Sequence, residues 1–439
     1  MSNFVQRVVS KALLKADDWR LTTGIISGMA AVPQTPGSLS FEDARRLVEQ
    51  HAARATSCGV EMVELLNSVG RVLAERICAD RDFPPFRRAM RDGYAVRAAD
   101  IEKVPATVQV VGEIKAGALP QTFPSNVGPG EAAAIMTGAP APDGADAVVM
   151  VEYTSLDGDR ATITRSVSRG ENIVPLGSEA KSGTVLLEPG TRLDYGTIAV
   201  AASVGREQVP VFRRPEVAIL STGDEVVPIG QAPAPTQIRN SNSYSLAAQV
   251  QAAGGTPRML GIARDEIDHL RSLIDQGLKS DLLLLAGGVS MGKYDLVEQV
   301  LADFGAEFFF TGAQIQPGRP IVFGRARDRY FFGLPGNPLS TMVTFELFVT
   351  PMLEGLSGMG QRKLRFLHAR LKSEIRTKTG LKRFLPGVFS GEFEKAEVEL
   401  ADWHGSGDVA AMARSNCYVV IPPDRERIEA GEWVAVMLR

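Results

Sequence analysis

The sequence predicts a multidomain α/β protein whose central domain is a doubly wound, mostly parallel α/β sheet. Its 439 residues are too many for one typical hydrophobic core, so several domains are expected. From Glu216 to about residue 360, apolar strand-like runs alternate with helical stretches, a pattern typical of a parallel sheet covered on both faces. On either side of this region, short β-rich runs are separated by proline and glycine turns. We therefore expect a small β-rich module before the α/β domain and a C-terminal β-domain after it.

The composition is that of an ordinary globular enzyme. Hydrophobic residues make up 44% of the chain and charged residues 23%, and the net charge of −3 provides no basic field for nucleic acid or acidic membranes. No apolar run approaches the roughly 18 residues of a membrane span. Cys58, Cys78 and Cys417 are far apart, which fits a reducing compartment and gives neither a disulfide framework nor a metal pattern. These observations predict a cytoplasmic protein without nucleic-acid or membrane partners.

Residues 1–37 are interpreted as a flexible N-terminal extension. Residues 4–15 are basic and amphipathic but lack the continuous apolar stretch of a secretory signal. A transit peptide and a surface-binding helix are the alternatives. The Gly/Ala/Pro/Thr-rich stretch at residues 28–38 favours a frayed extension.

The remaining elements are expected in the following order. Ser40 to Asp43 forms a capping box that opens a helix. Residues 104–167 alternate short strands with turns and predict the β-rich module, and Arg213 to Pro215 is interpreted as a linker. In the α/β region the expected strands are residues 217–221, 258–262, 281–286 and 330–332, and helices are expected after Asn240, Asp265, Asp295 and Asn337. Short strands return within residues 361–439.

Four glycine-containing loops lie at strand ends of the α/β domain. Because ligands bind beyond the carboxyl ends of the strands in an open α/β sheet, these loops are the predicted site. Glycine lets backbone amides approach an anion closely, and hydroxyl groups add donors. The loops match neither a Walker motif nor a dinucleotide fingerprint. Their candidate substrate-binding residues are Ser221, Thr222, Gly223, Asp224, Gly287, Gly288, Ser290, Lys293, Pro317, Gly318, Pro335, Gly336, Asn337 and Pro338.

The segment from Gly333 to Pro338 is the most informative of these loops. It reads as a rigid turn between a buried strand and a helix, with Asn337 placed to N-cap the helix and Pro338 suited to its first turn. The free N–H groups and positive dipole end of such a helix form a seat for phosphate. A tight turn that binds no ligand is an equal alternative for this motif alone.

Acidic residues recur at three strand ends, as Glu225, Asp265 and Asp295. Carboxylates beside a phosphate seat would repel it unless a cation such as Mg²⁺ lies between them. Asp295 as a helix cap and Glu225 as the partner of an arginine are the structural alternatives. Taken with the glycine-rich loops, the acids predict a nucleotide or phosphate site with a divalent cation.

The motifs resemble, in their order, those of the MoeA family, the molybdopterin molybdenumtransferases, which are related to the E domain of gephyrin. The resemblance extends over about residues 40–439. It rests on several independent segments: Pro84 to Phe86 with Asp92 to Ala95, Ile135 to Pro140, Ser221 to Glu225, Asn240 to Asn242, Gly287 to Ser290, Pro317 to Pro320 and Gly333 to Pro338.

The resemblance implies the final step of molybdenum cofactor synthesis. Adenylylated molybdopterin and molybdate are bound, the pyrophosphate-like linkage is cleaved, AMP leaves, and the pterin dithiolene ligates molybdenum, with Mg²⁺ assisting. Arg319, Ser290 and Ser406 are candidate molybdate ligands, and Asn240 and Ser241 join the substrate-binding residues. The candidate catalytic residues are Asp92, Glu225, Asp265, Asp295 and Arg319, and the candidate metal ligands are Glu225, Asp265 and Asp295.

The resemblance also implies an elongated homodimer with its site between subunits. The α/β domain of one chain would face the β-module of the other, which would give Asp92 and Thr137 a role. The implied parts are an elongated linker and dimer domain (38–80 and 169–214), the inserted β-module (81–168), the α/β domain (215–360) and the C-terminal β-domain (361–439). Other cofactor-synthesis proteins are further candidate partners. An adenylyltransferase acting on the same pterin and a non-catalytic pterin-binding scaffold are the alternatives.

The chain departs from its relatives at several positions. Gln316 and Arg319 stand where relatives commonly have lysine, so one cationic charge is lost. Arg87 and Arg88 replace polar residues of the first signature, and Glu179 stands where aspartate is usual. One hypothesis is that Arg87 or Arg88 of the other subunit compensates for Gln316. A lineage variant without functional meaning is the alternative.

Overall fold

The computed structural model describes residues 37–122, 124–288, 296–360, 362–392 and 394–439. The predicted N-terminal extension therefore lies almost wholly outside the described residues. Ser290, Lys293 and Asp295 also lie outside them. Within the described part of the chain, no helix is long and apolar enough to cross a membrane.

The central domain contains a six-stranded, mostly parallel sheet with the strand order β17-β14-β18-β23-β22-β19. Strands β14 (Glu216–Thr222), β17 (Thr256–Ala263), β18 (Leu282–Ala286) and β23 (Arg329–Leu334) pair in parallel. Strands β22 (Val322–Ala326) and β19 (Glu307–Phe310) extend the sheet in the antiparallel sense. The fold class predicted from the alternating pattern is confirmed.

Helices cover both faces of this sheet because its central strands are apolar at nearly every position. Alternate residues of β18, such as Leu284 and Leu283, belong to two separate hydrophobic clusters. The first cluster includes residues of α1, α3 and the segment α6–α7, and the second includes residues of α4 and α5. The helix bounds are α1 Phe41–Ala52, α3 Ser241–Ala252, α4 Ile267–Gly277, α5 Leu296–Asp303, α6 Pro338–Thr344, a π-helical segment Phe345–Val349 and α7 Thr350–Leu356.

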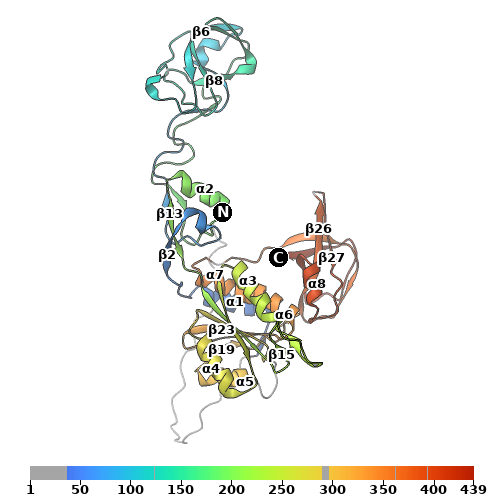
Figure 1. The fold of residues 1–439 in the computed structure, drawn as a ribbon. Helices are drawn as coiled ribbons and strands as arrows, with labels where there is room; N and C mark the ends of the chain where they lie inside the picture. The colour runs from blue at the N-terminus through green and yellow to red at the C-terminus, as the bar shows by residue number, and fades with distance from the viewer. Residues whose placement is uncertain (1–36, 123, 289–295, 361, 393) are drawn as a thin grey trace, which may run out of the picture. The chain divides into compact units, whose positions relative to one another are not determined.

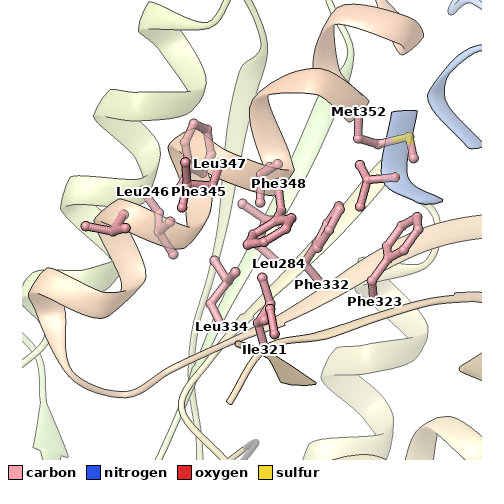
Figure 2. Packing of buried hydrophobic residues seen from close by; sticks show 14 of the residues in the cluster. Leu246, Leu284, Ile321, Phe323, Phe332, Leu334, Phe345, Leu347, Phe348 and Met352 are labelled. Carbon is pink, nitrogen blue, oxygen red and sulfur yellow. The ribbon is translucent and has the colours of Figure 1, made fainter. Parts of the chain in front are cut away.

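The larger cluster lies under the helix that follows the Gly333–Pro338 turn. Figure 2 shows Phe332 and Leu334 of β23 together with Phe345 and Phe348 of the π-helical segment, all of which are buried. Burying a phenylalanine stabilises a fold by about 1.5–3 kcal/mol relative to leaving it exposed. The turn is therefore held between a strand and a helix that are both anchored in the core.

The N-terminal half contains the predicted β-rich module, shown in cyan in Figure 1. Its six-stranded sheet has the order β8-β5-β7-β6-β10-β9 and begins before the expected residue 104. The strands are β5 Gly93–Val96, β6 Ala106–Ile114, β7 Glu131–Ile135, β8 Ala147–Met150, β9 Thr154–Asp157 and β10 Arg160–Ile163. Short 3₁₀ turns occupy Ala98–Ile101, Pro120–Thr122 and Val151–Tyr153.

The chain segments before and after this module run side by side. Three antiparallel pairs join them: β2 (Val60–Glu64) with β13 (Gln208–Phe212), β3 (Ile77–Cys78) with β12 (Val185–Leu187), and β4 (Arg88–Ala89) with β11 (Ile173–Val174). Helix α2 (Tyr195–Ser203) and a 3₁₀ turn (Leu65–Ser68) accompany β2 and β13. The predicted domain boundaries stay a prediction.

The C-terminal region forms a closed β-structure. Its strands are β24 Leu367–Leu371, β26 Lys382–Glu392, β27 Lys395–Leu400, β28 Cys417–Ile421 and β30 Trp433–Leu438, and β26 also pairs with β28. Strand β21 (Ile315–Gln316) of the α/β domain pairs in parallel with β26. This pairing attaches the C-terminal barrel, orange to red in Figure 1, to the α/β domain.

Smaller elements complete the described structure. These are β1 Ser38–Leu39 with β20 Gly312–Ala313, β15 Val226–Val227 with β16 Ile238–Arg239, β25 Ile375–Arg376 with β29 Arg427–Ile428, and α8 Val409–Arg414.

Candidate functional site

The strand-end loops of the α/β sheet line one cavity of about 940 Å³, together with residues of the C-terminal barrel. From the barrel, Leu381, Trp403 and Ser406 complete the wall. The predicted residues that line the cavity are Ser221, Thr222, Gly223, Glu225, Asn240, Ser241, Asp265, Gly287, Gly288, Pro317, Gly318, Arg319, Pro335, Gly336, Asn337, Pro338 and Ser406. The topology thus brings together loops that lie far apart in the chain, from Ser221 to Ser406.

The wall formed by the α/β domain depends on close backbone approach. A Cβ atom on Gly288 would lie 2.5 Å from Thr222 Oγ1, and the φ angle of Gly288 is +64°. Only glycine fits both restrictions without strain. The Oγ1 atom of Thr222 and the Oδ1 atom of Asn242 are both buried and have no hydrogen-bond partner in the described structure. Because buried polar groups are nearly always paired, two unpartnered atoms at one wall set this wall apart.

Asn242 also lines the cavity, although it is not among the residues predicted from the motifs. Its Nδ2 donates to the carbonyl of Gly336 over 2.7 Å, so it joins the helix α3 start to the turn at the end of β23. The sequence signal was present, because Asn242 belongs to the Asn240 to Asn242 motif. Which of these polar residues turns toward the cavity depends on the helix start, which the motif does not specify.

Ser221 and Asn240 are buried at the wall of the cavity and connect strand β14 to the start of helix α3. Both are buried, and Ser221 Oγ donates to Asn240 Oδ1 over 3.0 Å. Asn240 Oδ1 also accepts from Ser243 N over 3.1 Å and caps helix α3. Their side chains fix the positions of the neighbouring loops.

Two of the predicted acids meet at the cavity edge. Glu225 and Asp265 both line it, and Asp224 Oδ1 accepts a 3.3 Å hydrogen bond from Asp265 N. Partial burial raises the pKa of Asp265, and the charges of Asp224 and Glu225 raise that pKa further. A Cβ on Gly223 would lie 2.5 Å from Glu225 Oε2, so glycine leaves room for this carboxylate. Oxygen donors with uncompensated negative charge suit a hard cation.

Of the three predicted metal ligands, the described structure includes Glu225 and Asp265 but not Asp295. Asp224 lies outside the main cavity, beside Glu225. Among the described residues, no group of three or more His, Cys, Asp or Glu side chains is placed to hold a metal ion. The third predicted ligand, Asp295, is outside those residues, so the full set of Glu225, Asp265 and Asp295 stays a prediction.

The predicted side-chain cap of the helix after Gly333–Pro338 is wrong. Asn337 occupies the N-cap position of α6, but its side chain makes no cap hydrogen bond. Its Nδ2 instead donates to Ser406 Oγ over 2.9 Å, and Ser406 O accepts from Leu339 N over 3.0 Å. A backbone carbonyl of the barrel therefore satisfies an N–H group that a cap would otherwise bind. The Leu339 N–H group, one of the donors expected to bind an anion, is therefore already bound to the Ser406 carbonyl.

The opposite wall carries Gln316 and Arg319, the two residues for which the family resemblance leads us to expect lysine. Arg319 is exposed and lines the cavity. Gln316 also lines it, and its Oε1 accepts a 2.8 Å hydrogen bond from Arg383 Nε of the barrel. Arg383 is 6% exposed. An arginine of the C-terminal barrel thus contacts Gln316, at the position where the family resemblance leads us to expect a lysine.

Asp92 and Thr137 lie in the β-module and not in the cavity. The structure brings them together: Asp92 Oδ1 accepts from Thr137 N over 2.6 Å and from Thr137 Oγ1 over 2.8 Å. The backbone hydrogen bond, and then the hydroxyl one, lower the pKa of Asp92. This exposed carboxylate is therefore ionised and fixed in direction.

Arg87 and Arg88 have partners within their own part of the chain. Arg87 donates to the carbonyls of Ala145 over 2.9 Å and Pro142 over 2.8 Å, and Arg88 pairs with Glu179 over 3.2 Å. Both guanidinium groups therefore have partners in the single chain, and the hypothesis that either compensates for Gln316 in another chain stays a prediction.

Comparison with protein families matches almost the whole described chain. Models of the MoeA N-terminal region (domain I and II), a probable molybdopterin binding domain, and the MoeA C-terminal region (domain IV) match residues 39–205, 218–355 and 368–438. The molybdopterin molybdenumtransferase of Nostoc sp. is 36% identical over 86% of this chain and 88% of its own. That of Bacillus subtilis is 35% identical over 86% of this chain and 89% of its own.

Solved structures agree with these relatives. A molybdopterin biosynthesis MoeA protein from Pyrococcus horikoshii superposes with a TM-score of 0.76 at 30% identity, over 92% of this chain and 100% of the other. The resemblance inferred from the motifs is confirmed, and the chain belongs to the MoeA family, the molybdopterin molybdenumtransferases.

Proposed function

We propose that this protein inserts molybdate into adenylylated molybdopterin and releases AMP, as the last step of molybdenum cofactor biosynthesis. The observation that carries the proposal is the cavity in which glycine loops, two carboxylates, Arg319 and the unpartnered Thr222 Oγ1 meet. Relatives at 32–36% identity over most of this chain are named for the same activity.

The glycine-rich wall supplies the phosphate contacts in this proposal. The backbone amide of Gly288 and the hydroxyl of Thr222 belong to this wall, whereas the Gly287 amide already donates to Leu334 O over 3.1 Å. Preorganised donors of this kind stabilise developing negative charge without reorganisation. Arg319 offers a planar donor fork to an oxyanion.

Mg²⁺ fits the acidic edge of the cavity. Glu225 and Asp265 would hold it, with Asp295 as the third ligand, and the ion would neutralise charge on the phosphate oxygens as the linkage is cleaved. Burial and, after it, repulsion from Asp224 and Glu225 raise the pKa of Asp265, and the cation would relieve the repulsion.

A molybdate-dependent assay tests the proposal. Purified protein is given adenylylated molybdopterin, Mg²⁺ and molybdate, and AMP is followed, with EDTA replacing Mg²⁺ as the control. AMP release that needs molybdate and the cation supports the proposal. ATP consumption on bare molybdopterin would instead identify an adenylyltransferase, and tight pterin binding without turnover would identify a scaffold.

We also propose that the protein works as a homodimer with the β-module of one chain near the cavity of the other. Helix α2 is apolar on nearly all sides, yet Ala201 is its only buried residue. Tyr195 is 91% exposed, and Leu66 and Met62 nearby in the same part of the chain are also exposed. A helix that is apolar all round is normally covered. A second copy of the chain would cover this face and place Asp92 at the site.

Light scattering of charge variants tests the dimer. Tyr195→Glu is expected to shift the mass from two chains toward one and to reduce AMP release. Leu156→Glu, at a 58% exposed position of β9, is the matched control and is expected to change neither. A dimer that persists in Tyr195→Glu with full activity would contradict this assignment of the interface.

The proposed compartment is the cytoplasm. Cys58, Cys78 and Cys417 are all free thiols in the structure, which suits a reducing environment. Proteins that supply the adenylylated pterin and receive the finished cofactor would be its partners there.

A further inference from the structure

Arg383 is a buried cation without a counter-ion. Only 6% of its surface is exposed, and Arg383 forms no ion pair with any of the described residues. Its partners are neutral: Nε donates to Gln316 Oε1 over 2.8 Å, and Nη1 donates to Leu381 O over 3.0 Å. Burial lowers the pKa of Arg383, which is the cost of removing the charge from water. Arginine is seldom buried in this way unless an anion accompanies it.

The contact with Arg383 determines how Gln316 faces the cavity. An arginine Nε–H can only donate, so the atom of Gln316 that it meets must be the carbonyl oxygen. The two N–H bonds of the Gln316 amide are then left for another acceptor. Gln316 is exposed and lines the cavity, whereas Arg383 does not.

The fold holds this pair in register. Gln316 of β21 lies opposite Arg383 of β26 in a parallel ladder, and Lys382 N donates to Gln314 O over 3.1 Å. The two side chains therefore come from different domains but from paired strands. Their contact does not depend on loop conformation.

We propose that Gln316 binds a tetrahedral oxyanion in the cavity through its amide N–H groups and that Arg383 is the positioning residue that orients and polarises this amide. The inference rests on the proposed function and deepens it. At the position where the family resemblance leads us to expect a lysine, this chain would use a pair of residues. The neutral amide of Gln316 would contact the anion, and the positive charge would be that of Arg383 on the other side of the amide. The anion is molybdate or a phosphate group of the nucleotide, which share this chemistry.

The sharpest variant is Gln316→Glu. It is isosteric and keeps an oxygen for Arg383, but it replaces the donors by a carboxylate oxygen. Loss of a charge-assisted hydrogen bond and addition of repulsion are expected to weaken anion binding by roughly 10- to 100-fold. The matched control is Gln314→Glu, the same substitution two residues earlier at an exposed position outside the cavity lining.

Calorimetric titration of the full-length protein measures binding without requiring turnover. Sodium molybdate and AMP are titrated separately into wild type, Gln316→Glu and Gln314→Glu. Weakened molybdate binding in Gln316→Glu alone assigns the amide to molybdate, and weakened AMP binding assigns it to the nucleotide phosphate. Equal affinities for both anions in the two variants, or no binding of either anion by wild type, would overturn the inference.

A charge exchange tests the role of Arg383. Arg383→Met keeps much of the side-chain volume and is expected to weaken the same anion about 10-fold or more. Gln316→Lys combined with Arg383→Met returns the charge to the position used by relatives and is expected to restore affinity to within about three-fold, since coupled residues are non-additive. A merely structural role for Arg383 would show no such rescue. If Arg383→Met does not fold, Gln316→Glu decides the question.

Failure of the proposed function is separate from failure of this inference. Wild-type protein that binds molybdate through Gln316 but releases no AMP would contradict the transferase proposal alone. Wild-type protein that releases AMP while Gln316→Glu binds both anions as Gln314→Glu does would contradict this inference alone.

Discussion

The two walls of the cavity are built by different means. The α/β wall is made of backbone: glycine loops at the ends of parallel strands, with Gly288 against Thr222 Oγ1. The barrel wall is made of side-chain contacts between distant segments, Asn337 with Ser406 and Gln316 with Arg383. A methyl group on Gly288 should disrupt the first wall, because its Cβ would lie 2.5 Å from Thr222 Oγ1. A substitution in the second wall removes a single hydrogen bond, so we expect it to reduce activity less.

The largest effect is expected for Gly288→Ala in the backbone wall. The new Cβ would lie 2.5 Å from Thr222 Oγ1 and 3.0 Å from a methyl carbon of Val297, at a positive φ angle. Strain of about 1–3 kcal/mol and a displacement of the loop are expected to lower AMP release about 100-fold. Steady-state kinetics and thermal unfolding measure the two effects.

Gly230→Ala is the matched control for this prediction. Gly230 has nothing within 4 Å of a Cβ position. It should keep wild-type kinetics and melting temperature. Comparable activity in the two alanine variants would show that the α/β wall tolerates side chains and would remove the contrast between the walls.

A smaller effect is expected for Ser406→Ala in the barrel wall. The hydroxyl that accepts from Asn337 Nδ2 is lost, but the Ser406 carbonyl still receives Leu339 N. Loss of one hydrogen bond of this kind costs about 1 kcal/mol, so we expect about five- to ten-fold slower AMP release with an intact fold. Ser390→Ala, at an exposed position of β26, should leave the rate unchanged. A loss as great as that of Gly288→Ala would make the two walls equivalent.

The smallest effect is expected for Thr137→Val, which tests a side-chain contact that belongs to neither wall. The hydroxyl bond to Asp92 Oδ1 disappears and the backbone bond remains, so the pKa of Asp92 should rise but stay below its ordinary value. NMR titration of the carboxyl carbon measures this shift directly. An unchanged titration would contradict the assigned hydrogen bond.

The same contact sets the sign of a pH dependence. Because folding lowers the pKa of Asp92, its contribution to stability is present above the unfolded pKa, about 3.9, and is lost as the pH falls through the folded value. The difference in free energy of unfolding between wild type and Thr137→Val should therefore be seen at neutral pH and shrink in acid. Urea unfolding at both pH values checks this.

Local patterns predicted much of what the structure contains. Alternating apolar strands and helices predicted the central sheet, and Ser40 and Asn240 were recognised as the caps of α1 and α3. Such signals lie within a few residues of one another, so the sequence carries them directly. The strand-end rule likewise predicted which loops line the cavity, since parallel strands end at one edge.

The missed features involve residues that are distant in the chain. The cap of α6 was assigned to Asn337 from local preference, but Ser406, 69 residues away, took part of that role. The contact of Gln316 with Arg383 spans 67 residues and depends on the pairing of β21 with β26. No local pattern specifies such a partner.

The sequence by itself determined the order of the elements, the positions of the strand-end loops and the family resemblance, because each is written in short motifs with local physical causes. The tertiary structure alone decided which side chains complete those loops. It placed a buried arginine behind Gln316 and a barrel serine beside Asn337. Hydrogen-bond partners are chosen by proximity in space, and proximity follows from the packing of whole domains.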